Sequence, residues 1–325
     1  MAGSKQHTIP QFYLRRFLSP GYVFRKWETR PAKKRSPKGV AVEFEYYGAP
    51  TEGETTLDDV NDKIEDYSAR TLQKIVEHPQ DIDAADLVVI RYFIANLAVR
   101  TPAVVDSIKD AMVRLGAQVS AKTDHMKKVI EKQLRDGTKL SALALPSIHS
   151  PSDEAEGVSM PVEEFIAEMD KVRALTIATP EAMGTYRAMP DIAEAIRSMR
   201  MVVFEAPPER SFITSDNPVV VRRAATGLPG LGGWMAPDAF TAVPLSPSHL
   251  LFLVKDGVVP EFDLPDFSVY DTSRDMVDAA NIDTLRYTRA EAYSSSDNAE
   301  ARRWMRGSGM WEPRSQPIEL LPGWA

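Results

Sequence analysis

A chain of 325 residues with 43% hydrophobic and 26% charged residues is long enough to form one large soluble domain or two domains of ordinary size. The sequence contains no cysteine, which excludes disulfide bonds, thiolate zinc sites and cysteine nucleophiles. No apolar run approaches the roughly 18–20 residues that a membrane span requires, and the first residues lack the apolar core of a signal peptide. We therefore expect a cytoplasmic protein without a membrane segment.

The net charge of -7 disfavours indiscriminate binding to nucleic acid, but the positive charges are unevenly distributed along the chain. One stretch between two strand-like segments is strongly basic and contains Arg25, Lys26, Arg30, Lys33, Lys34, Arg35 and Lys38. Two interpretations stay open for this stretch. It is either a solvated hairpin loop or an arm that contacts phosphate groups or nucleic acid.

The N-terminal part combines two strand-like segments with an amphipathic helix. Residues 22–29 and 40–47 alternate apolar and polar positions and are rich in aromatic and β-branched side chains, which predicts two strands paired with each other. Thr56 and Asp59 have the spacing of a helix capping box, and apolar residues then recur at helical spacing to about His78.

The next segment, from Ala84 to Arg100, is apolar on nearly every side. It is too short to cross a bilayer, so it predicts the buried central helix of the domain. Pro102 lacks a backbone N–H and disfavours helical geometry at the residue before it, so the helix should kink or end there. Further helical segments are expected at 105–115, 126–134, 162–172 and 178–199, the last of them interrupted near Pro190.

The residue pattern changes from helical to strand-like at Met201, where strand-like runs separated by Pro, Gly and Asp begin. These runs cover residues 201–204, 212–214, 219–221, 240–243 and 250–254, and a helical segment follows at 276–285. The order of two strands, a block of helices and a mostly β region favours the α+β class. We predict one integrated domain over residues 1–310, with a central helical block packed on a mostly antiparallel sheet built from N- and C-terminal strands, and a tail at 311–325.

Four polar residues next to apolar anchors are the candidate catalytic groups: His7, Glu65, Arg100 and Asp216. The imidazole of His7 suits acid–base chemistry because it titrates near neutral pH, although it could equally be a structural histidine that caps backbone groups. Arg100 lies on the apolar helix, so its charge needs a partner, for which Glu65 and Asp216 are the candidates. The alternative is an anion site in which Arg100 holds a phosphate or carboxylate.

The candidate binding residues are Asn96, Thr214, Ser215 and Asn217. Asn96 lies four residues before the arginine of the apolar helix, and the other three surround Asp216 at the end of a strand. Ser215 lacks the glycines of a nucleophile elbow, so we assign catalysis to Asp216, which would orient the histidine or bind a divalent metal ion. A plain turn is the alternative. We expect His7, Glu65, Arg100 and this turn to meet in one place, because buried polar groups need partners.

The order of these motifs resembles a bacterial family known as domain of unknown function 4238. The resemblance spans His7 to about Tyr293 and is carried by His7-x-x-Pro10-x-x-x-Leu14-x-x-Phe17, Phe44-Glu45-Tyr46-Tyr47, Ile64-Glu65, Arg100-Thr101-Pro102, Thr214-Ser215-Asp216-Asn217-Pro218, Pro244-Leu245-Ser246-Pro247 and Asn281. It implies a bacterial protein with one integrated domain and no established activity. Asn217 stands where an imidazole can occur in the family.

Two functional hypotheses follow from these residues. The first is a hydrolase that cleaves phosphodiester bonds in nucleic acid or nucleotides, with the histidine as acid–base group, two carboxylates, an arginine anion clamp and the basic stretch as a backbone contact. The second is a non-catalytic module that senses a small anionic ligand or binds a protein partner, within a bacterial defence system.

Overall fold

The computed structural model of the chain describes residues 5–18, 21–25, 32–44, 57–101, 186, 188–225, 233–255, 258 and 266–305. The helices expected at 105–115, 126–134 and 162–172 and the tail at 311–325 lie outside these residues. The helices that it describes are α1 (Gln11–Arg15), α2 (Leu57–Glu77), α3 (Ala84–Arg100), α7 (Met189–Arg197), α8 (Arg274–Tyr287) and α9 (Ala299–Met305). Short 3-10 turns occur at η1 (Pro37–Gly39), η2 (Pro79–Asp81) and η3 (Gly233–Met235).

The strands of the described residues form three sheets. They are β1 (Lys5–His7), β2 (Gly21–Arg25), β3 (Lys33–Arg35), β4 (Val42–Phe44), β5 (Met199–Glu205), β6 (Thr214–Ser215), β7 (Arg222–Arg223), β8 (Ala239–Pro244), β9 (His249–Lys255), β10 (Val269–Asp271) and β11 (Glu291–Ser294). The strand orders are β10-β5-β9-β8-β7, β3-β2-β11-β6 and β1-β4. Among the described strands β10 runs parallel to β5 and the other pairs are antiparallel, so the predicted α+β class is confirmed.

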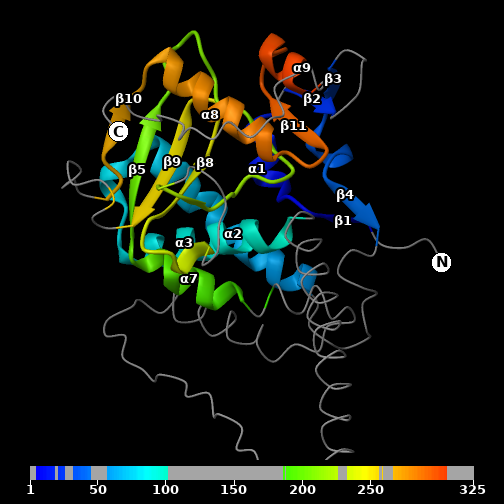
Figure 1. The fold of residues 1–325 in the computed structure, drawn as a ribbon. Helices are drawn as coiled ribbons and strands as arrows, with labels where there is room; N and C mark the ends of the chain where they lie inside the picture. Colours follow the sequence, from blue (N-terminus) through cyan, green and yellow to red (C-terminus); the bar gives the residue numbers. More distant parts are fainter. Residues whose placement is uncertain are drawn as a thin grey trace, which may run out of the picture.

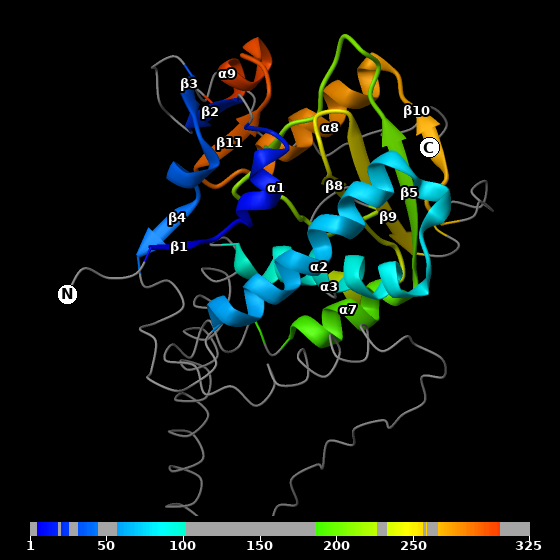
Figure 2. The ribbon, with the colours of Figure 1, turned by 180° about the vertical axis from the view of Figure 1, so that it is seen from behind.

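The five-stranded sheet is packed between two layers of helices (Figures 1 and 2). Successive side chains of a strand point to opposite faces, and β5 shows the consequence. Met201 and Val203 belong to the large core formed with α2, α3 and α7, whereas Val202 and Phe204 pack with Val277 of α8. The predicted contact between the helical block and a sheet is therefore present.

Helix α3 is the central buried helix that the sequence predicts. It begins at a capping box in which the Asp83 side chain accepts from the Asp86 backbone N–H and the Asp86 side chain accepts from the Asp83 N–H. It ends at Arg100, and Thr101 has an extended ψ of 137°, as expected for a residue before proline. Because Phe93 and Ile94 are fully buried, the helix is fixed by its neighbours on several sides.

The predicted pairing of the first two strands is wrong. β2 pairs with β3 and β11, and β4 pairs with β1. The predicted strand 22–29 corresponds to β2, and β4 lies within the predicted strand 40–47. The reason is that β11, which lies far away in sequence, satisfies one edge of β2, and the basic stretch supplies a strand of its own for the other edge. The four-stranded sheet thus joins the N- and C-terminal parts of the chain.

Two smaller predictions are refined by the structure. Pro190 lies in the first turn of α7, where its missing N–H costs no hydrogen bond, so it starts a helix and does not interrupt one. The strand expected at 219–221 is absent, and the short strand β7 begins directly after it at Arg222. In the described part of the chain, no helix is long and apolar enough to cross a membrane.

Candidate functional site

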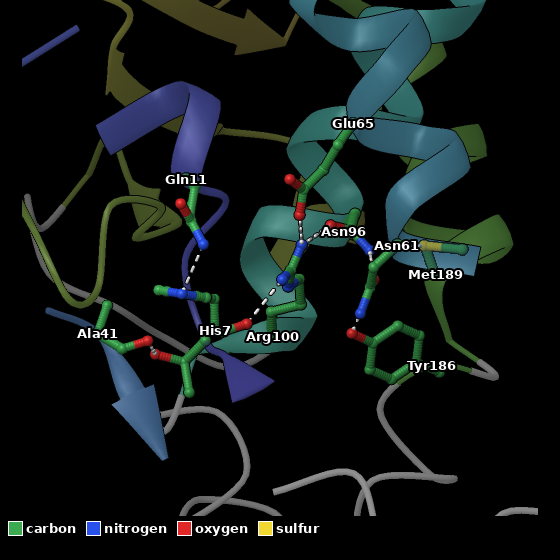
Figure 3. A network of polar contacts seen from close by, with 10 residues as sticks. His7, Gln11, Ala41, Asn61, Glu65, Asn96, Arg100, Tyr186 and Met189 are labelled. Atoms are coloured by element: carbon green, nitrogen blue, oxygen red, sulfur yellow. Dashed lines mark hydrogen bonds and ion pairs between the residues drawn. The ribbon is translucent and has the colours of Figure 1, made fainter. Parts of the chain in front are cut away.

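His7 is the last residue of β1 and lies opposite Val42 of β4. Its side chain is half-buried, and the next residue, Thr8, ties the segment to β4 by donating from its N–H to the carbonyl of Ala41 at 2.9 Å. An amide N–H of Gln11, in the first turn of α1, donates to Nε2 of His7 at 2.7 Å (Figure 3). This contact selects the neutral ring that carries its proton on Nδ1. Backbone and ring are therefore both held.

Arg100 connects this segment to two helices. Its side chain is only 3% exposed, and Nη1 forms an ion pair with Oε1 of Glu65 on α2 at 2.8 Å. Nη1 also donates to Oδ1 of Asn96 at 3.4 Å, and Nη2 donates to the backbone carbonyl of His7 at 2.7 Å. Figure 3 shows the guanidinium between these partners. The predicted ion pair with Glu65 is confirmed, and the charge fixes the position of His7.

Glu65 is the half-buried acid of the site, with 21% of its side chain exposed. Burial raises the pKa of its carboxyl above the ordinary value, and the attraction of Arg100 only partly opposes this shift. Asp62 and Asp66, on the same helix, raise the pKa further. The carboxyl thus keeps its proton to a higher pH than an ordinary glutamate does.

The network extends into the core through residues that the sequence analysis missed. Nδ2 of Asn96 donates to Oδ1 of Asn61 at 2.8 Å, and the hydroxyl of Tyr186 donates to the same oxygen at 3.1 Å. All three side chains are buried (Figure 3). Asn61 lies four residues before Glu65 and so on the same side of α2, a spacing that could have revealed it. Tyr186 carries no comparable signal.

The carboxylate of Asp216 binds backbone groups next to β11. Oδ1 accepts from the backbone N–H of Arg289 at 2.9 Å, and Oδ2 accepts from those of Ala290 and Glu291 at 2.6 and 2.9 Å. Burial raises the pKa of this carboxyl, although the three backbone hydrogen bonds lower it. The side chain thus fastens the turn to the start of β11, and within the described residues none of its hydrogen bonds goes to His7.

The rest of this turn is bonded to the scaffold as well. Ser215 Oγ accepts from the backbone N–H of Asn217 at 3.1 Å, and Nδ2 of Asn217 donates to the carbonyl of Tyr287 at 3.0 Å. Thr214 is the link to the first group, because its hydroxyl lies 2.7 Å from the hydroxyl of Tyr13 on α1. The Tyr13 hydroxyl in turn donates to the carbonyl of Pro244 at 2.7 Å. Helix α1 therefore contacts His7 through one residue and the turn through another.

Comparison with known families places the chain. The profile of a family described as a protein of unknown function, DUF4238, matches residues 5–298. The chain belongs to the DUF4238 family. This DUF4238 protein is not significantly similar to any curated protein or to any solved structure.

In the described part of this DUF4238 protein, the site combines a held histidine ring with a buried ion pair, an arrangement that suits acid–base chemistry. The guanidinium of Arg100 is buried and directed to protein groups, so it supports the His7 segment and the Glu65 charge. Across the described ranges, no group of three or more histidine and carboxylate side chains is arranged to hold a metal ion. His7 is the half-buried titratable ring that this arrangement positions.

Proposed function

We propose that this DUF4238 protein is a hydrolase that cleaves phosphodiester bonds and that His7 is its acid–base residue. One observation carries the proposal: a buried, ion-paired arginine holds the backbone of a half-buried histidine while Gln11 holds its ring. A side chain that titrates near neutral pH is useful in catalysis when its position is fixed and it keeps access to solvent. Burial of Arg100 supplies the fixed position, and the partial exposure of His7 supplies the access.

The proposed step begins when a water molecule replaces the Gln11 amide at Nε2 of His7. The ring then takes a proton from this water as its oxygen attacks the phosphorus. The bond from phosphorus to the leaving oxygen breaks, and the imidazolium returns the proton to that oxygen. Glu65 and Arg100 act as positioning residues in this scheme. Asp216 acts on the turn and not on the histidine, because three backbone N–H groups occupy its carboxylate.

A second function is favoured by the direction of the hydrogen bonds. The donors of Arg100 and the acceptors of Asp216 reach protein groups in different parts of the fold, as expected of residues that stabilise a scaffold. In that case the protein is a non-catalytic module that binds a small anionic ligand or a protein partner, and His7 caps the end of β1.

The two functions are distinguished by comparing His7→Ala with the matched variant His78→Ala. His78 is an exposed histidine at the end of α2, so its loss removes an imidazole without touching the site. The purified proteins are incubated with labelled RNA and DNA, with a divalent metal ion and with a chelator. Cleavage by the wild type and by His78→Ala, lost in a folded His7→Ala protein, supports the hydrolase. Equal cleavage by all three proteins, or none by any, contradicts it.

A further inference from the structure

The described part of the chain has one segment that is exposed and purely basic. β3 and the adjoining η1 carry four exposed cations, and none of them forms an ion pair with a carboxylate of the described residues: Lys33, Lys34, Arg35 and Lys38. Among the described residues, the acid nearest to them along the chain is Glu43, which is paired with Arg289 at 3.5 Å. In a protein with a net charge of -7, an uncompensated group of four cations is a local exception.

The four cations lie along a sheet edge. β3 is the outer strand of the β3-β2-β11-β6 sheet, so one side of its backbone faces away from β2. Lys33 and Arg35 point to one face of the sheet and are about 6.8 Å apart along the strand. Lys34 points to the other face, where its ammonium lies 5.6 Å from the ring centre of Tyr22, a half-buried aromatic residue on β2.

Edge lysines can serve simply to keep sheets of different molecules apart. On the neighbouring strand β2, by contrast, the cation Arg25 is paired with an acid, Glu291, at 2.8 Å. The row on β3 has no acidic partner within the described residues, and an aromatic ring lies beside its middle member, Lys34. A basic row with an aromatic side chain is how proteins bind single-stranded nucleic acid, whose phosphates meet the cations and whose bases stack on the ring.

We propose that β3 and η1 form a binding surface for the phosphate backbone of single-stranded nucleic acid. The surface leads to the candidate site, because η1 runs into β4 and β4 pairs with the strand that ends at His7 (Figure 2). The choice of nucleic acid over an acidic peptide rests on the proposed phosphodiester hydrolysis and on Tyr22. The inference thus names the substrate class of the proposed reaction.

The test measures binding separately from cleavage. His7→Ala protein is titrated, in the presence of a chelator, into a labelled single strand of about 20 nucleotides, which is longer than typical binding sites for single strands. A variant with Lys33, Lys34, Arg35 and Lys38 changed to Gln is compared with a control in which four other exposed cations are changed to Gln: Lys63, Arg197, Arg210 and Arg274. The control loses the same charge outside the surface.

Each phosphate contact with a single strand contributes about -0.7 to the slope of log K against log salt. Four contacts predict a slope of about -2.8, which corresponds to about fifty-fold weaker binding when salt rises from about 50 to about 200 mM. The surface variant should lose most of this slope, and the control should retain it. Equal binding by the surface variant and the control would overturn the proposal, as would the absence of binding or equally tight binding of a polyglutamate peptide. Because cleavage takes no part in this test, binding here combined with no cleavage by the wild type in the assay above would refute the hydrolase alone.

Discussion

Replacing Arg100 by methionine tests whether the ion pair holds the candidate site together. The substitution keeps an unbranched apolar stem but removes the guanidinium, and so leaves the Glu65 carboxylate, Oδ1 of Asn96 and the His7 carbonyl without their shared donor. Breaking a buried ion pair costs about 3–5 kcal/mol. We expect a loss of about 3 kcal/mol in the free energy of unfolding at neutral pH, the lower end of that range, because 21% of the Glu65 side chain still reaches water.

The loss of stability in Arg100→Met should depend on pH, because the protonation of Glu65 changes with pH. Its pKa is raised in the folded protein, so the folded state holds this proton more strongly than the unfolded chain does. The stability that the folded protein gains by binding this proton is therefore complete below the ordinary pKa of 4.5 and is lost as the pH rises through the folded pKa. Without Arg100 the folded pKa rises further, so Arg100→Met should differ least from the wild type in acid and most at neutral pH.

Urea unfolding at several pH values, followed by tryptophan fluorescence, measures this effect. Arg197→Met is the matched control, because Arg197 and its partner Glu194 are 67% and 64% exposed and such surface pairs contribute little. Adding Glu65→Gln to Arg100→Met should recover stability at neutral pH, since a neutral amide needs no counter-charge. A loss below about 1 kcal/mol for Arg100→Met, or a loss that is the same at every pH, would refute the reasoning.

Three further substitutions test the scaffold by the same unfolding measurement. Tyr13→Phe should cost about 1–2 kcal/mol, because it removes the hydroxyl that contacts Thr214 and a buried carbonyl; stability equal to the wild type would show that this link is unimportant. Asp216→Asn should cost about 3 kcal/mol, because an amide group cannot accept from all three backbone N–H groups; loss of activity with unchanged stability would instead indicate a catalytic Asp216. Gly21→Ala should cost about 2 kcal/mol or more, because its Cβ would lie 2.3 Å from a backbone oxygen. Gly39→Ala should be nearly neutral, because its Cβ would meet no atom within 4 Å. Similar stability losses for the two variants would contradict this packing.

The helical part of the fold could be predicted from the sequence because its signals are local. The segment from Ala84 to Arg100 combines continuous apolar character with a following proline, and both act within a few residues. Strand pairing is not local. Nothing near β2 indicates that β11, far along the chain, lies beside it, so the pairing with residues 40–47 was the simplest and the wrong choice.

The candidate site was also predictable only in part. A charge on a buried helix has to be paired, so electrostatics predicted an acidic partner for Arg100 and left Glu65 and Asp216 as candidates. The structure selects Glu65. The partners of Asp216 are backbone N–H groups, which every residue except proline possesses. Hydrogen bonds to backbone groups leave no pattern in the sequence, so only the structure identifies the partners of Asp216.

The most direct test of the hydrolase proposal compares two titrations in the same protein. Nuclear magnetic resonance follows the imidazole of His7, assigned by its absence in His7→Ala, while kcat/KM for cleavage of a single-stranded oligonucleotide is measured over the same pH range. We predict that kcat/KM changes at the pH where His7 titrates, because the free-enzyme profile reports the essential acid or base. Cleavage that changes at a different pH, or that His7→Ala retains, would contradict the assignment of His7 as the acid–base residue.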